Sequence, residues 1–166
     1  MDKEPRPVLL SLHPEWAEAI LNGRKTAEVR KRAPLQPHPY KVYIYCTYPP
    51  YGCIQKYCSD GQIREASGHV IGEAICFATV DYDGPFDNRS FGKTCLTPEQ
   101  ISEYAGSAKK LSCMYLRDPV TYDIPVPLSV FGLKRPPQSW QYLQRGPEQY
   151  ADGKAPLPRG LEAHRP

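Results

Sequence analysis

The sequence predicts a mixed α+β domain in which a small curved or barrel-like sheet is flanked by short helices. Strand-like and helix-like segments alternate near the N-terminus, two long apolar segments follow, and a second helix start comes late. The 19 prolines and 12 tyrosines favour short strands joined by stiff loops over long helices. The sequence contains neither a glycine-rich phosphate loop nor the pattern of a doubly wound parallel sheet.

Length and charge set the broad class. The 166 residues are enough for one well-buried core, and the net charge of +3 permits nucleic acid as a partner without indicating it. No apolar run reaches the roughly 18 residues of a membrane span, and the polar N-terminus does not resemble a secretion signal. We therefore expect a cytoplasmic protein without membrane contact, in which disulfides are not expected.

The first elements are a strand at residues 8–12 and a short helix at residues 14–22. Pro14 suits the first helical position, and Gly23 is a natural helix terminator. An apolar stripe would hold the helix on the sheet; it consists of Trp16, Ile20 and Leu21.

The next stretch, residues 22–32 (NGRKTAEVRKR), gathers five cations around a single carboxylate. Thr26, Glu28 and Arg30 alternate with apolar residues, which is the period of a strand with one polar face. Two interpretations stay open: an ion-paired strand surface, or the wall of a functional site.

Two longer strands are predicted at residues 42–48 and 70–82, and both should be central in the sheet. Glu73 lies among the hydrophobic residues of the second strand. The intervening residues 49–68 contain turn formers and mixed charge, which indicates an insertion or flap with, at most, one helical turn.

The second half starts with a helix at Thr97, since Thr97 and Gln100 form a capping-box pattern and Leu96 can pack on Ile101. Residues 111–133 predict one or two strands whose prolines favour edges, bulges or turns over central pairing. Residues 146–166 have little to bury and are expected to form a flexible tail.

Cysteine and histidine give a weak metal signal. Cys53, Cys58 and His69 have a spacing that loosely suggests three ligands, but no further pair completes a tetrahedral set. We predict no metal site and no cofactor.

Four segments together resemble the ASCH family, a branch of the PUA-like β-barrels. They are residues 10–32, 42–49, 69–80 and 122–143, and the first contains the pattern Gly-x-Lys-Thr-x-Glu-x-Arg. The last segment is similar to versions found in phage and prophage genes. The resemblance implies an ASCH/PUA-like domain at residues 1–145, with the 49–68 insertion inside it.

This resemblance also implies function: a cleft beside the Lys-Thr segment, linked to RNA or nucleotide binding and in some members to catalysis. One branch resembles N4-acetylcytidine amidohydrolases, and another is associated with RNA cleavage. Lys25, Thr26 and Arg30 match family positions, but the amidohydrolase threonine nucleophile falls on Glu28. A carboxylate there suits a general base better than a nucleophile.

We expect a nucleic-acid-binding module, most simply for RNA or single strands. Lys25 and Arg30 would meet phosphate or a base carbonyl, and Glu28 could accept from an exocyclic amine. Tyr45 or Tyr48 could stack a base. Arg135, beside Trp140, could reach the rim of the cleft.

Two rival hypotheses remain. The first is an enzyme acting on RNA or on a modified nucleoside, with Lys25, Thr26 and Glu28 as catalytic groups and with Glu73 or Glu103 as the acid. The second is a phage-type accessory protein that binds a host protein through residues 49–68. Its apolar anchors would be Tyr51, Ile54 and Tyr57.

Overall fold

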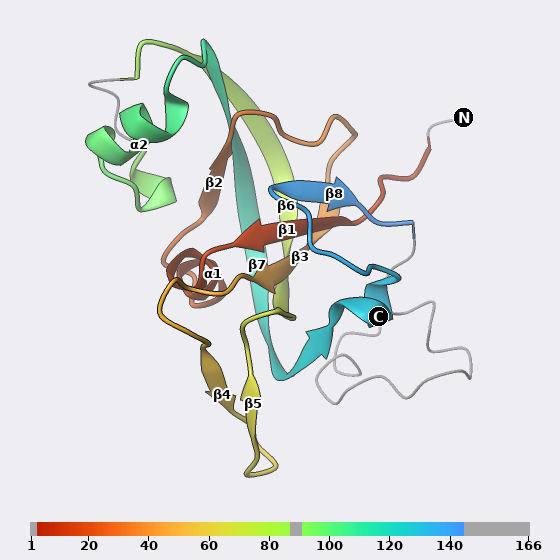
Figure 1. Cartoon of the computed structure of the whole chain (residues 1–166). Coiled ribbons are helices and arrows are strands. Elements are labelled where there is room, and N and C mark those ends of the chain that lie inside the picture. The colour runs from red at the N-terminus through yellow and green to blue at the C-terminus, as the bar shows by residue number, and fades with distance from the viewer. Residues whose placement is uncertain (1–2, 87–90, 145–166) are drawn as a thin grey trace.

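The computed structural model describes residues 3–86 and 91–144 of the chain. Six strands form one sheet: β1 Val8–Leu12, β2 Ala27–Arg30, β3 Tyr40–Cys46, β6 His69–Asp83, β7 Lys110–Pro127 and β8 Trp140–Tyr142. Their order is β2-β7-β6-β3-β1-β8, and the long strands β6 and β7 run through the whole molecule (Figure 1). The β1–β3 pair is parallel and the other pairs are antiparallel.

Two helices and a small hairpin complete the described fold. The helices are α1 (Pro14–Leu21) and α2 (Pro98–Ala105), and the hairpin consists of β4 (Gln55–Tyr57) and β5 (Ile63–Glu65). Two single turns of 3-10 helix, η1 (Gly92–Thr94) and η2 (Leu128–Phe131), follow β6 and β7. Neither helix is long and apolar enough to cross a bilayer, among the residues described.

The predicted mixed α+β class is confirmed, with a curled six-stranded sheet and two helices. The expectation of a barrel needs one correction, because the sheet is not closed (Figure 1). The terminal strands β2 and β8 are only four and three residues long, and each pairs with one neighbour only. The sheet is therefore a half-barrel whose open side lies between β2 and β8.

The segment at residues 49–68 is a hairpin, so the helical turn allowed for it is not formed. Gln55 pairs with Glu65 and Tyr57 with Ile63, and Gly61 turns the chain with a φ of 79°. The hairpin projects from the body of the fold at the bottom of Figure 1. Backbone hydrogen bonds between the two short paired strands take the place of those in a helix.

Residues 110–127 form one strand, which lies between β2 and β6. Yet β7 pairs with β2 only along Ser112–Tyr115, so its prolines lie where the partner on that side has ended. The pairing with β6 shifts register around Pro119, next to Asp118 with its φ of 52°. The expected bulges and edges are therefore present within a single long strand.

The sheet buries side chains on both faces. One face packs under α1 and includes Leu10, Val42 and Ala74, while the other includes Leu9, Tyr43 and Val126. Helix α1 approaches closely at Gly72, where an added Cβ would lie 2.5 Å from a methyl group of Leu21.

Helix α2 covers a third cluster at the far end of β6 and β7. Its predicted start is confirmed: Thr97 and Gln100 form a reciprocal capping box, and Leu96 and Ile101 pack in the same cluster. The flexible tail predicted at residues 146–166 lies outside the described residues.

Candidate functional site

The segment between α1 and β2 buries a lysine. The chain leaves α1 through Gly23, with a φ of 81°, and the backbone N–H of Lys25 donates to the carbonyl of Ala19. The Lys25 side chain is 1% exposed, and its Nζ donates to the carbonyl of Thr94 at 2.6 Å. A second contact, 3.0 Å to Glu28 Oε2, pairs its charge.

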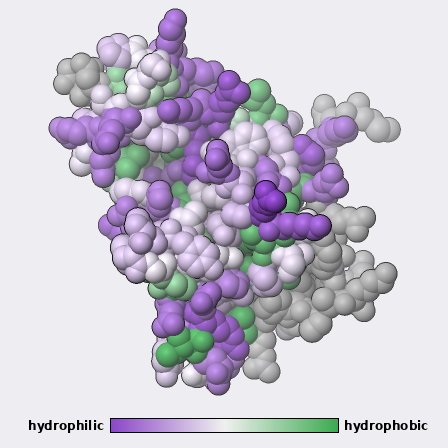
Figure 2. Space-filling model, viewed as in Figure 1, coloured by the Kyte–Doolittle hydropathy of each residue, from purple (hydrophilic) through white to green (hydrophobic). Residues whose placement is uncertain are grey.

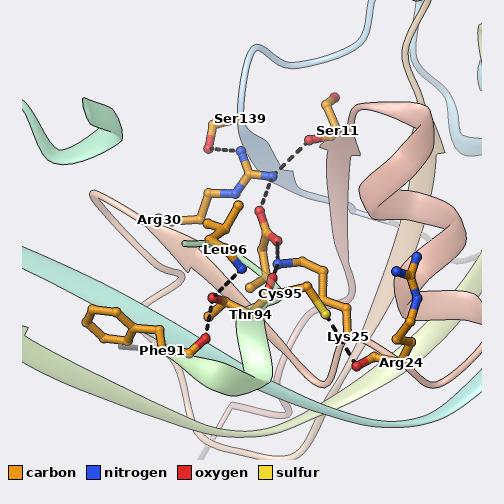
Figure 3. A network of polar contacts seen from close by, with 10 residues as sticks. Ser11, Arg24, Lys25, Arg30, Phe91, Thr94, Cys95, Leu96 and Ser139 are labelled. Atoms are coloured by element: carbon orange, nitrogen blue, oxygen red, sulfur yellow. Dashed lines mark hydrogen bonds and ion pairs between the residues drawn. The ribbon is translucent and has the colours of Figure 1, made fainter. Parts of the chain in front are cut away.

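Glu28 connects this lysine to Arg30. Its other oxygen lies 2.9 Å from Arg30 Nη2, so one carboxylate lies between two cations. The Arg30 guanidinium also donates to the Ser11 carbonyl at 2.9 Å and to Ser139 Oγ at 3.3 Å (Figure 3). We call Lys25, Glu28 and Arg30 the Lys25 network.

The Lys25 network joins four parts of the chain: β1, β2, η1 and the segment that leads into β8. Because Lys25 and Glu28 are buried and already paired, a ligand would have to displace an ion pair to reach either charge. Arg30 Nε is buried without a partner among the described residues. The geometry therefore favours the ion-paired interpretation.

Thr26 differs from its neighbours because its side chain is exposed. It lines a hollow of 280 Å³ together with Gly23, Lys25 and the irregular part of β7 at Arg117 and Asp118. Of Lys25, Thr26, Glu28 and Glu73, only Thr26 is exposed.

Glu73 is separated from these residues by the sheet. Ala74 packs with the α1-facing core, so the preceding side chain points to the opposite face. There Glu73 is 6% exposed, accepts from Tyr122 OH at 2.7 Å and pairs with Lys41 Nζ at 3.3 Å. We call Lys41, Glu73 and Tyr122 the Glu73 cluster. Glu103, the other proposed acid, is exposed on α2.

The predicted nucleic-acid contacts are also dispersed. Tyr45 is 5% exposed in the core on the Glu73 side, and burial raises the pKa of its hydroxyl. Tyr48 is 55% exposed and lies over Gly68, while Arg135 is exposed in the loop before β8. These three residues share no hollow with the Lys25 network among the pockets described.

A larger groove lies beside the Lys25 network. We call it the β8 groove; its volume is 760 Å³, and it is lined by Lys31, Arg32, Ala33, Pro34, Leu35, Gln36, His38, Thr79, Asp81, Lys110, Ser112, Trp140 and Tyr142. Arg30 pairs with Ser112 across the sheet and bonds Ser139 next to Trp140. The network therefore connects two walls of this groove.

The walls of the β8 groove are held by hydrogen bonds. Trp140 Nε1 donates to the carbonyl of Arg32 at 2.7 Å, and the Leu35 N–H donates to Tyr142 OH at 2.9 Å. The two rings meet edge to face with centroids 5.1 Å apart, and the guanidinium of Arg6 lies 4.2 Å above Tyr142.

The opposite wall contains the one acid of the groove. Asp81 accepts from Ser112 Oγ at 2.6 Å and pairs with Lys110 at 3.0 Å, and these contacts lower its pKa. His38 is exposed, bonds Thr79 Oγ1 at 3.0 Å and packs on Tyr40. A surplus of cations therefore surrounds two aromatic rings.

Sequence reasoning missed this groove, although part of the signal was present. Lys31 and Arg32 belong to the basic stretch that drew attention, but they lie just beyond β2. Trp140 and Tyr142 join them only through pairing of β8 with β1, at a separation of over a hundred residues. The alternation of polar and apolar residues at Thr26–Arg30 pointed to β2 and not to the residues that follow it.

The loose metal signal gains no geometric support. In the described part of the chain, no three His, Cys, Asp or Glu side chains converge where they could hold a metal ion. Cys53 is exposed, Cys58 is buried, and His69 Nδ1 lies 3.0 Å from the carbonyl of Ser67. Cys46 and Cys76 are buried in strands, and burial raises the pKa of Cys46 to about 11.

Comparison with known proteins gives a domain match and a similar protein. Residues 10–81 match the model of the ASCH domain. An ASCH domain-containing ribonuclease of Zymomonas mobilis is 28% identical over 148 residues, which cover 84% of this chain and 86% of that protein.

Solved structures agree with this match. The crystal structure of ASCH from Zymomonas mobilis has a TM-score of 0.65 and 28% identity, covering 88% of this chain and 93% of that one. A tyrosine-to-phenylalanine variant of the Zymomonas mobilis protein gives a TM-score of 0.67 at 27% identity, over 89% and 96% of the two chains. The resemblance to phage members and the domain boundaries stay predictions. Residues 10–81 thus match the ASCH domain, and the described chain is similar in sequence and fold to the Zymomonas mobilis ASCH protein.

Proposed function

We propose that this protein binds single-stranded RNA in the β8 groove. The observation that carries the proposal is the convergence of Lys31, Arg32 and Lys110 on a groove that also contains Trp140 and Tyr142. Cations that follow the phosphates and aromatic rings that stack bases are the two components of single-strand binding. The similarity to an ASCH domain-containing ribonuclease supports RNA as the nucleic acid.

The Lys25 network would act by positioning. Arg30 holds Ser139 at 3.3 Å, and Ser139 precedes Trp140, which in turn bonds the carbonyl of Arg32. Binding through the groove therefore relies on buried charges that do not themselves touch RNA. This proposal moves the contacts from Lys25 and Arg30 to the residues that follow them.

The test compares two double variants that each remove two exposed cations. Lys31→Ala/Arg32→Ala removes charge from the groove, and Lys134→Ala/Arg135→Ala removes equal charge outside it. We expect the first to weaken binding of a labelled single-stranded RNA about tenfold or more and to lower the salt slope by about two. Fluorescence anisotropy over a salt series measures both. An equal loss of RNA affinity in the two variants would contradict binding in the β8 groove.

Cleavage of RNA is the second candidate function, favoured by the similarity to a ribonuclease. The exposed Thr26 in the 280 Å³ hollow beside Lys25 is the group whose hydroxyl a substrate can reach. Glu28 and Glu73 are engaged in ion pairs on opposite sides of the sheet. Anisotropy that rises and then decays below the value of free RNA, in wild type but not in Thr26→Val, would support cleavage. N4-acetylcytidine hydrolysis can be followed with the same pair of proteins.

A further inference from the structure

A second groove lies between α1 and the β4–β5 hairpin, and the RNA binding proposed above does not involve it. We call it the hairpin groove; its volume is 580 Å³, within the range of binding pockets. Leu21, Ile54 and Ile71 supply apolar lining, and Tyr51 and Tyr57 stand beside them.

The hairpin wall of this groove is fixed to the body of the protein. The Ile54 N–H donates to Ser67 Oγ at 2.9 Å, and the Ser59 N–H donates to Asp123 Oδ1 at 2.9 Å. Lys56 Nζ donates to the carbonyl of Tyr122, and burial lowers the pKa of this lysine. A partner would therefore meet a preformed surface and would lose little free energy in ordering it.

Exposed apolar side chains concentrate around this hairpin. Of the eight large hydrophobic residues that are exposed in the described chain, four lie within residues 48–63; they are Tyr48, Tyr51, Tyr57 and Ile63. Figure 2 shows hydrophobic surface among hydrophilic residues on the hairpin, at the bottom of the view. Tyrosine is enriched at protein interfaces, because it buries a large ring and keeps a polar hydroxyl.

The free charge of the hairpin groove is negative. Glu15 and Glu18 line it from α1, both are exposed, and neither carboxylate has an ion-pair partner among the described residues. The lining cation, Lys56, is directed to a backbone carbonyl. Phosphates would be repelled here, whereas the β8 groove attracts them.

We propose that the hairpin groove binds a partner protein through a segment that carries Lys or Arg beside apolar side chains. The apolar side chains pack between Tyr51, Tyr57 and Leu21, and the cations meet Glu15 and Glu18. This interaction is independent of RNA, since the two grooves have opposite charge and share no lining residue.

The test selects short random-sequence peptides displayed on yeast against the full chain, and measures the affinity of the enriched peptides by anisotropy. Glu15→Lys/Glu18→Lys reverses the charge of the groove. Its matched control, Glu99→Lys/Glu103→Lys, makes the same change on the exposed face of α2, again with one residue in the first helical turn. A further variant, Tyr51→Ser/Tyr57→Ser, removes the aromatic wall.

We expect the enriched peptides to combine Lys or Arg with aliphatic or aromatic residues. Their affinity should fall about tenfold or more in the charge-reversed and tyrosine variants and stay unchanged in the α2 control. Peptides without basic residues, equal binding by all variants, or no enrichment would overturn the proposal. So would a labelled RNA whose affinity falls in the tyrosine variant, because the groove would then belong to RNA.

Discussion

The two faces of the sheet bury similar charged groups in different ways. In the Lys25 network, Glu28 lies between two cations, and the side chains of Lys25 and Arg30 are 1% and 11% exposed. In the Glu73 cluster, the acid meets a tyrosine hydroxyl and one lysine that is 26% exposed. Lys41 therefore keeps contact with water, while Lys25 depends entirely on its protein partners. The comparison therefore predicts that neutralising the carboxylate costs more free energy of unfolding where its cation partner is fully buried.

The largest expected effect comes from Glu28→Gln. This change leaves Lys25 and Arg30 buried without a counter-charge, and removing one partner of a buried pair costs about 3–5 kcal/mol. Urea unfolding followed by circular dichroism measures the loss. A loss of unfolding free energy below about 1 kcal/mol would contradict the interpretation of the Lys25 network as a buried ion pair.

Glu73→Gln is the matched change on the other face and should cost less. The amide oxygen can still accept from Tyr122, and Lys41 can turn towards water, so we expect about 1–2 kcal/mol. The same urea titration gives the comparison directly. Equal losses for the two variants would remove the distinction between the faces.

Ser139→Ala sharpens the link between the Lys25 network and the β8 groove. It removes one long hydrogen bond, at 3.3 Å from Arg30, so the free energy of unfolding should fall by no more than about 1 kcal/mol. RNA affinity should fall clearly even though the free energy of unfolding changes little, because Trp140 would be held less firmly in the groove. Anisotropy beside urea unfolding separates the two, and unchanged affinity would show that the link is not needed.

The smallest expected effect is the pH dependence of the exposed Ser59–Asp123 contact that anchors the hairpin. Bonds from Ser59 lower the pKa of Asp123, and the Arg64 partner lowers the pKa of Asp60 to about 2. Because these pKa values are lowered, the contacts of both carboxylates are fully formed at a pH above the ordinary carboxyl pKa of about 3.9. They are lost as the pH falls through the lowered pKa. The Ser59 amide signal in NMR should therefore change only below about pH 4. A change at higher pH would contradict the anchor.

Local rules were sufficient for most elements. Pro14 and Gly23 bracket α1, Thr97 and Gln100 start α2, and the alternation at Thr26–Arg30 gives β2. These signals act within a few residues, so they can be read along the chain. Even the prolines of β7 were informative, since they lie where the strand has lost one partner.

The sequence by itself thus determined the α+β class, both helices and the main strands, and it made residues 25–30 candidates for a site. Only the tertiary structure decided which charged residues meet. Glu28 and Glu73 were both candidates for one catalytic site, and the sheet separates them. Trp140 reaches Arg32 because β8 pairs with β1. Such contacts join residues far apart in the chain and depend on sheet order, which no local pattern encodes.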